Sequence, residues 1–192
     1  MTTVLVVYGS RHGGTQGIAE RIGEVLQAEG LASEVVAAAH DTDIGDADAV
    51  VVGSGVYTGK WLDEPIRFLE RNQLALATRP LWLFSSGPLP GSTASKTADD
   101  PMTDALGPAD GPGSGGRKRI EAISGATRPR DHRVFLGAYD PSDPPRSMTE
   151  RVVRMMPAGK GILPTGDFRE WDAIESWARD IAAALRPELV SA

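Results

Sequence analysis

Short apolar runs alternate with segments of helical periodicity along this chain, and that alternation constrains the fold more than any other feature. Thr3–Tyr8 is a β-branched apolar run typical of a strand buried on both faces. Thr15–Gln27 then repeats its apolar residues at helical spacing. Strands joined through helices form parallel sheets with right-handed crossovers. We therefore predict an α/β domain with a doubly wound, five-stranded parallel sheet and helices on both faces.

The expected elements follow one another in regular order. Strands are predicted at Thr3–Tyr8, Leu31–Ala37, Ala49–Val52, Arg79–Ser85 and Arg133–Tyr139, and helices at Thr15–Gln27, Asp63–Glu70, Arg117–Ile123, Ser147–Met156 and Asp167–Leu185. The acidic segment Asp41–Asp48 is predicted to form turns.

One domain with one long insertion accounts for the 192 residues. Residues 88–116 are rich in Gly, Pro, Ser, Thr and Asp, so we interpret them as a functional lid or a disordered insert. The chain has no cysteine, which excludes disulfides, thiolate nucleophiles and cysteine-based zinc sites. No stretch approaches the ~20 apolar residues of a membrane span, and no signal peptide is recognisable. We expect a cytoplasmic protein.

The loop after the first strand is rich in glycine and hydroxyl groups and opens directly into the first helix. A helix N-terminus offers unpaired N–H groups and the positive end of the helix dipole, and Gly13 and Gly14 let the backbone fold closely around an anion. The loop matches neither a Walker A motif nor a G-x-G-x-x-G fingerprint. We predict phosphate binding here, in preference to a plain strand-to-helix turn. The proposed ligands are Ser10, Arg11, His12, Gly13, Gly14 and Thr15.

Two further loops follow the third and fourth strands. The first, Gly53–Trp61, places flexible glycines beside Tyr57, on which we expect a planar ring to stack. For Trp61, stacking on the ligand and packing into the core are equally plausible. In the second loop, Ser85 and Ser86 could hydrogen-bond the polar edge of a heterocycle. In an open parallel sheet, ligands bind outside the carboxyl ends of the strands, where these loops meet.

Positive charge gathers in the C-terminal half, although the formal net charge is −6. Residues 117–160 carry a net charge of +5 and the remainder −11. These charges are either an ordinary solvated surface or a basic face for an anionic substrate, partner or lipid surface. Segment 146–160 joins basic residues to apolar pairs, which permits peripheral membrane contact but is also typical of a core-packed helix. We assign no metal ligand and no catalytic residue, predict no nucleic-acid partner, and expect His40 and His132 on the surface.

Taken together, the loops resemble the flavin-binding loops of flavodoxins. Over most of its length the chain resembles the menaquinone-dependent protoporphyrinogen IX dehydrogenase branch of the flavodoxin-like families, through Val51–Gly59, Val134–Tyr139, Thr165–Asp172 and Trp177–Ala182. The resemblance implies strand order 2-1-3-4-5 and an FMN cofactor whose phosphate lies on Ser10–Thr15. It also implies isoalloxazine contacts from Ser54, Gly55, Val56, Tyr57, Thr58, Gly59, Ser85, Ser86 and Gly87.

Three functions are compatible with this resemblance. In the first, the chain is an FMN-dependent oxidoreductase that passes electrons from a small organic substrate to a quinone, with protoporphyrinogen as one candidate substrate. Alternatively, it is a non-catalytic electron carrier that docks on a redox partner. The third alternative is a related scaffold that uses a deazaflavin or no flavin. Residues 88–116 differ from the basic region that this branch carries there, which leaves the substrate open.

Overall fold

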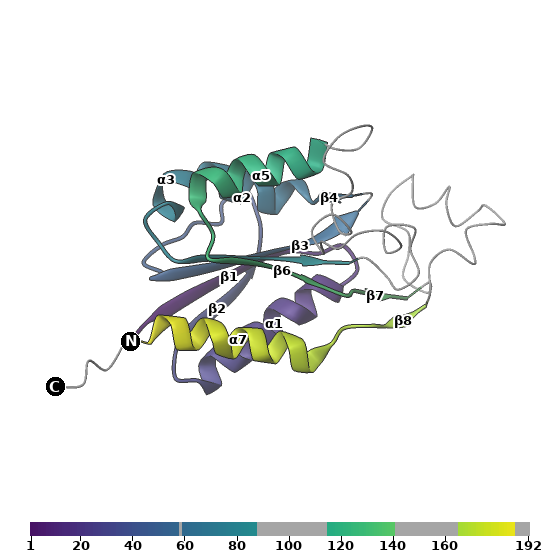
Figure 1. Ribbon diagram of the computed structural model, residues 1–192, viewed down its shortest axis with the longest axis horizontal. Helices are drawn as coiled ribbons and strands as arrows, with labels where there is room; N and C mark the ends of the chain where they lie inside the picture. Colours follow the sequence, from purple (N-terminus) through teal and green to yellow (C-terminus); the bar gives the residue numbers. More distant parts are fainter. Residues whose placement is uncertain (58, 88–114, 141–164, 187–192) are drawn as a thin grey trace.

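A parallel sheet separates two layers of helices in the computed structural model, which describes residues 1–57, 59–87, 115–140 and 165–186 (Figure 1). Its strands lie in the order β2-β1-β3-β5-β6, and every neighbouring pair on this path is parallel. The short strand β4 pairs antiparallel with β3, off this path. The doubly wound α/β prediction is therefore confirmed, and the order of the five long strands agrees with 2-1-3-4-5. The strands are β1 (Thr3–Gly9), β2 (Ala32–Ala37), β3 (Ala49–Tyr57), β4 (Lys60–Trp61), β5 (Leu81–Ser86) and β6 (Asp131–Phe135).

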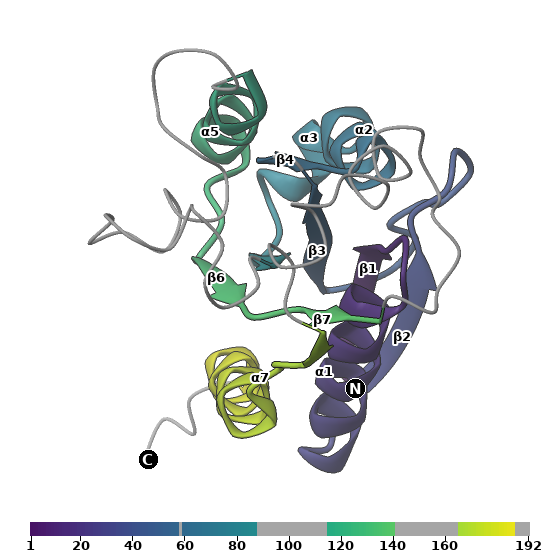
Figure 2. The same cartoon turned by 90° about the vertical axis from the view of Figure 1, so that its right-hand side faces the viewer.

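Each face of the sheet carries its own apolar core (Figures 1 and 2). Helices α1 (Gly14–Ala28) and α7 (Trp171–Leu185) cover one face, where Phe84 and Trp177 pack edge to face. On the other face lie α2 (Asp63–Arg71), α3 (Gln73–Leu76) and α5 (Gly115–Thr127). Burial of a large apolar side chain contributes about 2 kcal/mol. These paired cores therefore fix the sheet edge from which the loops emerge.

Several element boundaries differ from those predicted, and three of these differences change the assignment of strands. β3 continues to Tyr57 instead of ending at Val52, because Gly53–Gly55 pair with β5 and the last two residues pair with β4. The predicted fifth strand is divided into β6 and β7 (Ala138–Tyr139). α7 begins at Trp171 rather than Asp167, because β8 (Gly166–Asp167) pairs antiparallel with β7. The predicted helix Ser147–Met156 and most of the insert 88–116 lie outside the described residues.

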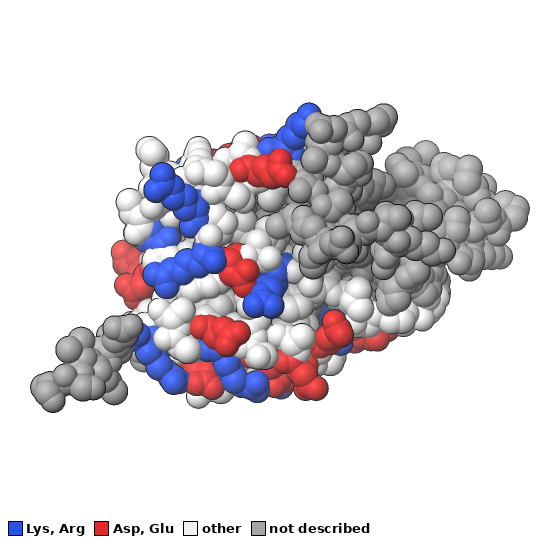
Figure 3. All heavy atoms as spheres, in the orientation of Figure 1, with Lys and Arg blue, Asp and Glu red and all other residues white. Residues whose placement is uncertain are grey.

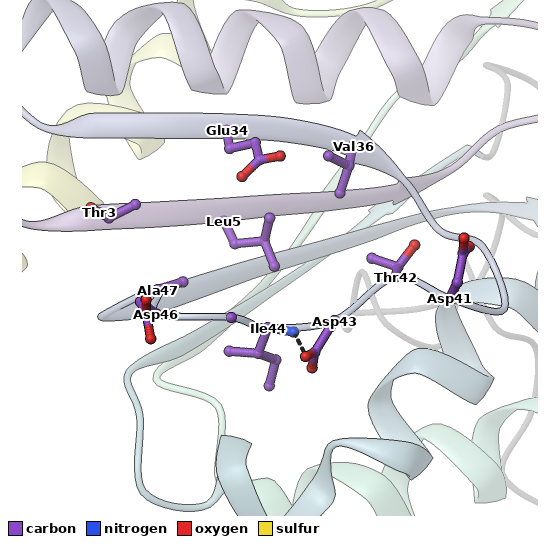
Figure 4. Close-up of a pocket in the computed structure, with 11 residues that line it drawn as sticks. Thr3, Leu5, Glu34, Val36, Asp41, Thr42, Asp43, Ile44, Asp46 and Ala47 are labelled. Atoms are coloured by element: carbon purple, nitrogen blue, oxygen red, sulfur yellow. Dashed lines mark hydrogen bonds between the residues drawn. The ribbon is translucent and has the colours of Figure 1, made fainter.

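The connection from β2 to β3 crosses the sheet without a helix, as the turn prediction for Asp41–Asp48 requires. A pocket of about 480 Å³ lies between this connection and strands β1 and β2 (Figure 4). Leu5, Val36 and Ile44 supply its apolar lining, whereas Glu34 and Asp43 are among its acidic residues. The pocket runs along the face of the sheet, not across the carboxyl ends of the central strands.

Candidate functional site

The sheet register brings the three predicted loops to one edge. Gly9 of β1 pairs with Ser54 of β3, and Ser54 in turn pairs with Ser85 of β5. Because these three neighbouring strands are parallel, their carboxyl ends lie at the same edge of the sheet. The predicted juxtaposition of the loops is therefore present in the folded chain.

The first loop has the geometry of an anion site. Gly13 adopts a left-handed φ of 78° and precedes α1, whose N-terminus receives no side-chain cap. The Oγ of Ser10 is buried and has no hydrogen-bond partner among the described residues. An unsatisfied buried polar atom costs about 1–3 kcal/mol, so such an atom next to free helix amides indicates a place for a hydrogen-bonding ligand.

Side chains of the first two loops contact one another. The guanidinium carbon of Arg11 lies 4.9 Å from the centre of the Tyr57 ring, and the His12 ring lies 6.3 Å from it. Gly55 makes this approach possible: a Cβ there would lie 2.8 Å from Tyr57 Cε2 and 3.0 Å from Thr15 Oγ1. Glycine at position 55 thus lets the Tyr57 ring and the start of α1 approach the same strand.

Two predicted ligands use their hydroxyl groups inside the protein. Ser54 Oγ accepts a hydrogen bond from the Leu62 backbone N–H at 3.0 Å and donates to the Gly55 carbonyl at 3.0 Å. Ser85 Oγ accepts from Trp61 Nε1 at 2.8 Å and lies 3.0 Å from His132 Nε2. Both serines are fully buried, so they can contact a ligand only through their backbone N–H and C=O groups. Trp61 is buried in the core, which decides between its two interpretations.

His132 is a partly buried partner of the third loop, in place of the fully exposed residue that the sequence predicts. Its Nε2 faces Ser85, its ring meets the edge of Trp61 at 5.6 Å, and its Nδ1 is buried with no partner among the described residues. Burial lowers the pKa of His132 from 6.5 to about 4, against a smaller opposite effect of Asp131. The ring is therefore neutral at physiological pH. His40, by contrast, is exposed as expected.

A fourth segment, missed from the sequence, borders this edge. The Gly87 N–H donates to the Phe135 carbonyl at 3.0 Å, and a Cβ on Gly137 would lie 3.5 Å from Gly87 N. One residue further on, Ala138 lies against Gly14 of the first loop. Figure 2 shows β7 leading from the end of β6 across to α1. The contacts use backbone and small side chains, so no chemical signature in the sequence marks them.

The remaining predicted site residues have defined places, except Thr58, which lies outside the described residues. Val56 pairs with Trp61 in the β3–β4 hairpin, whose turn contains Gly59 with a φ of 72°. Ser86 is buried, and Gly87 has a φ of 98°.

Charges of both signs intermingle on the face drawn in Figure 3. Two basic residues of segment 117–160 form ion pairs with acidic residues at the surface. Arg119 binds Glu70 through Nε and Nη2 at 2.8 and 2.9 Å, and Arg133 binds Asp131 at 2.8 Å. These pairs favour the interpretation of a solvated surface for the described part of the segment. Segment 146–160 lies outside the described residues, and its membrane contact stays a prediction.

The fold and the loop cluster define a doubly wound α/β protein whose first helix begins at a glycine-rich loop. Residues 5–143 match the family described as Flavodoxin domain, and the chain belongs to this family. No curated protein matches the chain. Within the described residues, no helix is both long and apolar enough to cross a membrane.

Solved structures share the fold at low sequence identity. The chain is 17% identical to the Streptococcus pneumonia TIGR4 flavodoxin, covering 96% of this chain and 100% of that one with a TM-score of 0.54. For oxidised flavodoxin 1 from Bacillus cereus the identity is 11%, the coverage 96% and 100%, and the TM-score 0.57. Rubredoxin oxygen:oxidoreductase from Desulfovibrio gigas is 16% identical with a TM-score of 0.57. The match covers 100% of this chain and 38% of that one.

Proposed function

We propose that this protein binds FMN across the carboxyl ends of β1, β3 and β5. The observation that carries the proposal is the buried Ser10 Oγ, which has no hydrogen-bond partner among the described residues and lies in the loop that leads into the uncapped start of α1. Ser10–Thr15 would hold the phosphate through backbone amides and the Ser10 hydroxyl. Ser54–Gly59 and Ser85–Gly87 would border the isoalloxazine, with Tyr57 as its aromatic contact. Membership of the flavodoxin domain family supports this cofactor.

The proposed reaction is an FMN-dependent oxidation of a small organic substrate with a quinone as electron acceptor. Bound FMN would supply the hydride or electron transfer, and the chain would bind and orient it. Protoporphyrinogen is the candidate substrate, because the sequence resembles the quinone-linked branch through Thr165–Asp172 as well as through the loops. We assign the chain's own residues the role of binding and orienting the cofactor, and we assign no general acid or base.

A non-catalytic electron carrier is the second candidate function. Membership of the flavodoxin domain family supports this candidate. A carrier would exchange electrons with a redox partner at the exposed flavin edge. A related scaffold that holds a deazaflavin or no flavin remains the third alternative.

The spectrum and the released cofactor of the purified protein test the cofactor proposal. We expect flavin absorption bands, and FMN as the molecule released on denaturation. Apoprotein that takes up no FMN would refute the proposal, whereas release of a deazaflavin would move the protein to the third alternative.

Turnover then separates the two redox functions. Holoprotein is mixed with protoporphyrinogen IX and a menaquinone analogue, and porphyrin formation is followed by fluorescence. Porphyrin formed at a rate proportional to holoprotein supports the oxidoreductase. No turnover, combined with a reductive titration that shows two separate one-electron steps, supports the carrier.

A further inference from the structure

The antiparallel strand pair β7–β8 packs against the first turn of α1, from which both strands are distant in sequence. Ala138 pairs with Asp167 in this strand pair, and the Phe168 N–H donates to the Gly137 carbonyl at 3.2 Å. A Cβ on Gly14 would lie 3.5 Å from Ala138 N, so the strand pair touches the proposed phosphate loop directly. It therefore connects the loop after β5 to the loop after β1.

Arg169 forms the centre of this contact. Its guanidinium binds Asp167 through Nε at 2.8 Å and through Nη2 at 2.6 Å, and the Arg169 backbone N–H donates to the same carboxylate at 3.1 Å. The hydrogen bonds from Arg169 hold the pKa of Asp167 below its usual value. Arg169 also stacks on Trp171 at 4.4 Å, and its side chain is 17% exposed. A guanidinium fixed by a bidentate pair and an aromatic face has little rotational freedom left.

The free end of this guanidinium reaches the phosphate loop. Arg169 Nη1 donates to the Gly14 carbonyl at 3.4 Å, next to Gly13, whose left-handed backbone begins the helix. Gly17 makes room for it: a Cβ at Gly17 would overlap Arg169 Nη1. The sequence thus places a glycine, which costs about 1 kcal/mol relative to alanine inside a helix, at the position over which the guanidinium lies.

We propose that Arg169 is a positioning residue for phosphate binding, which locks the Gly13–Gly14 turn so that the first amides of α1 face the phosphate. The inference rests on the proposed FMN site and extends it to the β7–β8 strand pair. Arg169 acts through the Gly14 carbonyl, since Asp167 already neutralises its charge. Without this contact, the phosphate would have to order the turn on binding, and affinity for phosphate-bearing ligands would fall.

The test compares FMN with riboflavin, which lacks the phosphate. Apoprotein is titrated with each ligand by flavin fluorescence for wild type, Arg169→Ala and Gly17→Ala. Loss of a hydrogen bond from a charged group corresponds to about a tenfold weakening. We expect about a tenfold higher Kd for FMN in Arg169→Ala, and less than about a twofold change for riboflavin.

Gly17→Ala separates positioning from general destabilisation. Alanine favours the helix, yet its Cβ displaces the guanidinium, so the variant should weaken FMN binding without loss of thermal stability. Arg21→Ala is the matched control. It removes an ion pair between α1 and α7, the contact of Arg21 Nη2 with Glu175 at 2.5 Å, which lies about two helical turns from Gly14. This control should leave the FMN Kd within about twofold of wild type.

The outcomes distinguish this inference from the proposed function. Wild-type apoprotein that binds no FMN refutes the FMN site itself. Wild type that binds FMN, together with Arg169→Ala and Gly17→Ala variants of unchanged FMN affinity, refutes the role of Arg169 alone. Equal losses for FMN and riboflavin, or a loss of the same size in Arg21→Ala, also overturn it, because they would reflect general loosening of α1 against α7.

Discussion

Replacement of His132 by glutamine should remove a pH dependence of stability that the wild-type protein shows between pH 7 and pH 5. The His132 ring is packed against Trp61 and Ser85, and burial lowers its pKa from 6.5 to about 4. Above pH 6.5 the ring is neutral in the folded and unfolded chain, so it adds no pH dependence. Below pH 6.5 the unfolded chain binds a proton that the folded chain does not.

The size of the effect follows from the shift. The free energy of unfolding falls by about 1.4 kcal/mol for each pH unit between the two pKa values. Stability is therefore lost as the pH falls from 6.5, and the loss is complete at about pH 4. Over the whole interval it amounts to about 3 kcal/mol, of which about 2 kcal/mol falls between pH 7 and pH 5. The lowered pKa of Asp131, the nearest carboxylate, keeps that group ionised over this range.

Urea unfolding of wild type and His132→Gln at several pH values and constant ionic strength measures this difference. The advantage of wild type over the variant should shrink by about 2 kcal/mol from pH 7 to pH 5. His40→Gln, which removes an exposed histidine, is the matched control and should keep the wild-type slope. Parallel curves for wild type and His132→Gln would refute the reasoning, as would an NMR titration of the His132 ring with a midpoint near 6.5.

Three further substitutions test the core and the site. Ser10→Ala should stabilise the apoprotein by about 1 kcal/mol and weaken FMN binding, because it removes a buried hydroxyl that has no partner among the described residues. Thermal melts measure the stability and flavin titration the affinity. A variant that loses both stability and affinity would contradict the assignment. Trp61→Phe should lower the free energy of unfolding by about 1–3 kcal/mol by leaving Ser85 without its indole donor; an unchanged urea midpoint would speak against that bond. Gly53→Ala should cost about 3 kcal/mol, because its Cβ would overlap the fully buried Phe84 ring; wild-type stability in this variant would show that the ring can move.

Local patterns in the sequence were sufficient for most of the sheet. The apolar run of β1 and the helical period of α1 are properties of adjacent residues, so they can be read without knowledge of the fold. Right-handed crossovers then favour a doubly wound parallel sheet, and the resemblance to flavodoxins implies the strand order that the structure shows. The carboxyl-end rule brought the loops after β1, β3 and β5 to one edge for the same reason.

Tertiary contacts decided which partner each of the predicted site residues binds. A serine in a glycine-rich loop reads as a ligand, yet Ser85 binds Trp61, because the β3–β4 hairpin turns the indole inward. The sequence predicts His132 on the surface. It does not show that β6 lies beside β5 and brings the His132 ring against Ser85.

The sequence by itself determined the α/β alternation, the doubly wound parallel sheet and the glycine- and hydroxyl-rich start of the first helix. These features depend on the period of neighbouring residues and on the chirality of the chain. Only the tertiary structure decided that β7 and β8 cross the sheet edge and bring Arg169 to Gly14, 155 residues earlier in the chain. Such a contact leaves no local period, because it arises from packing of whole elements that satisfy their backbone groups together.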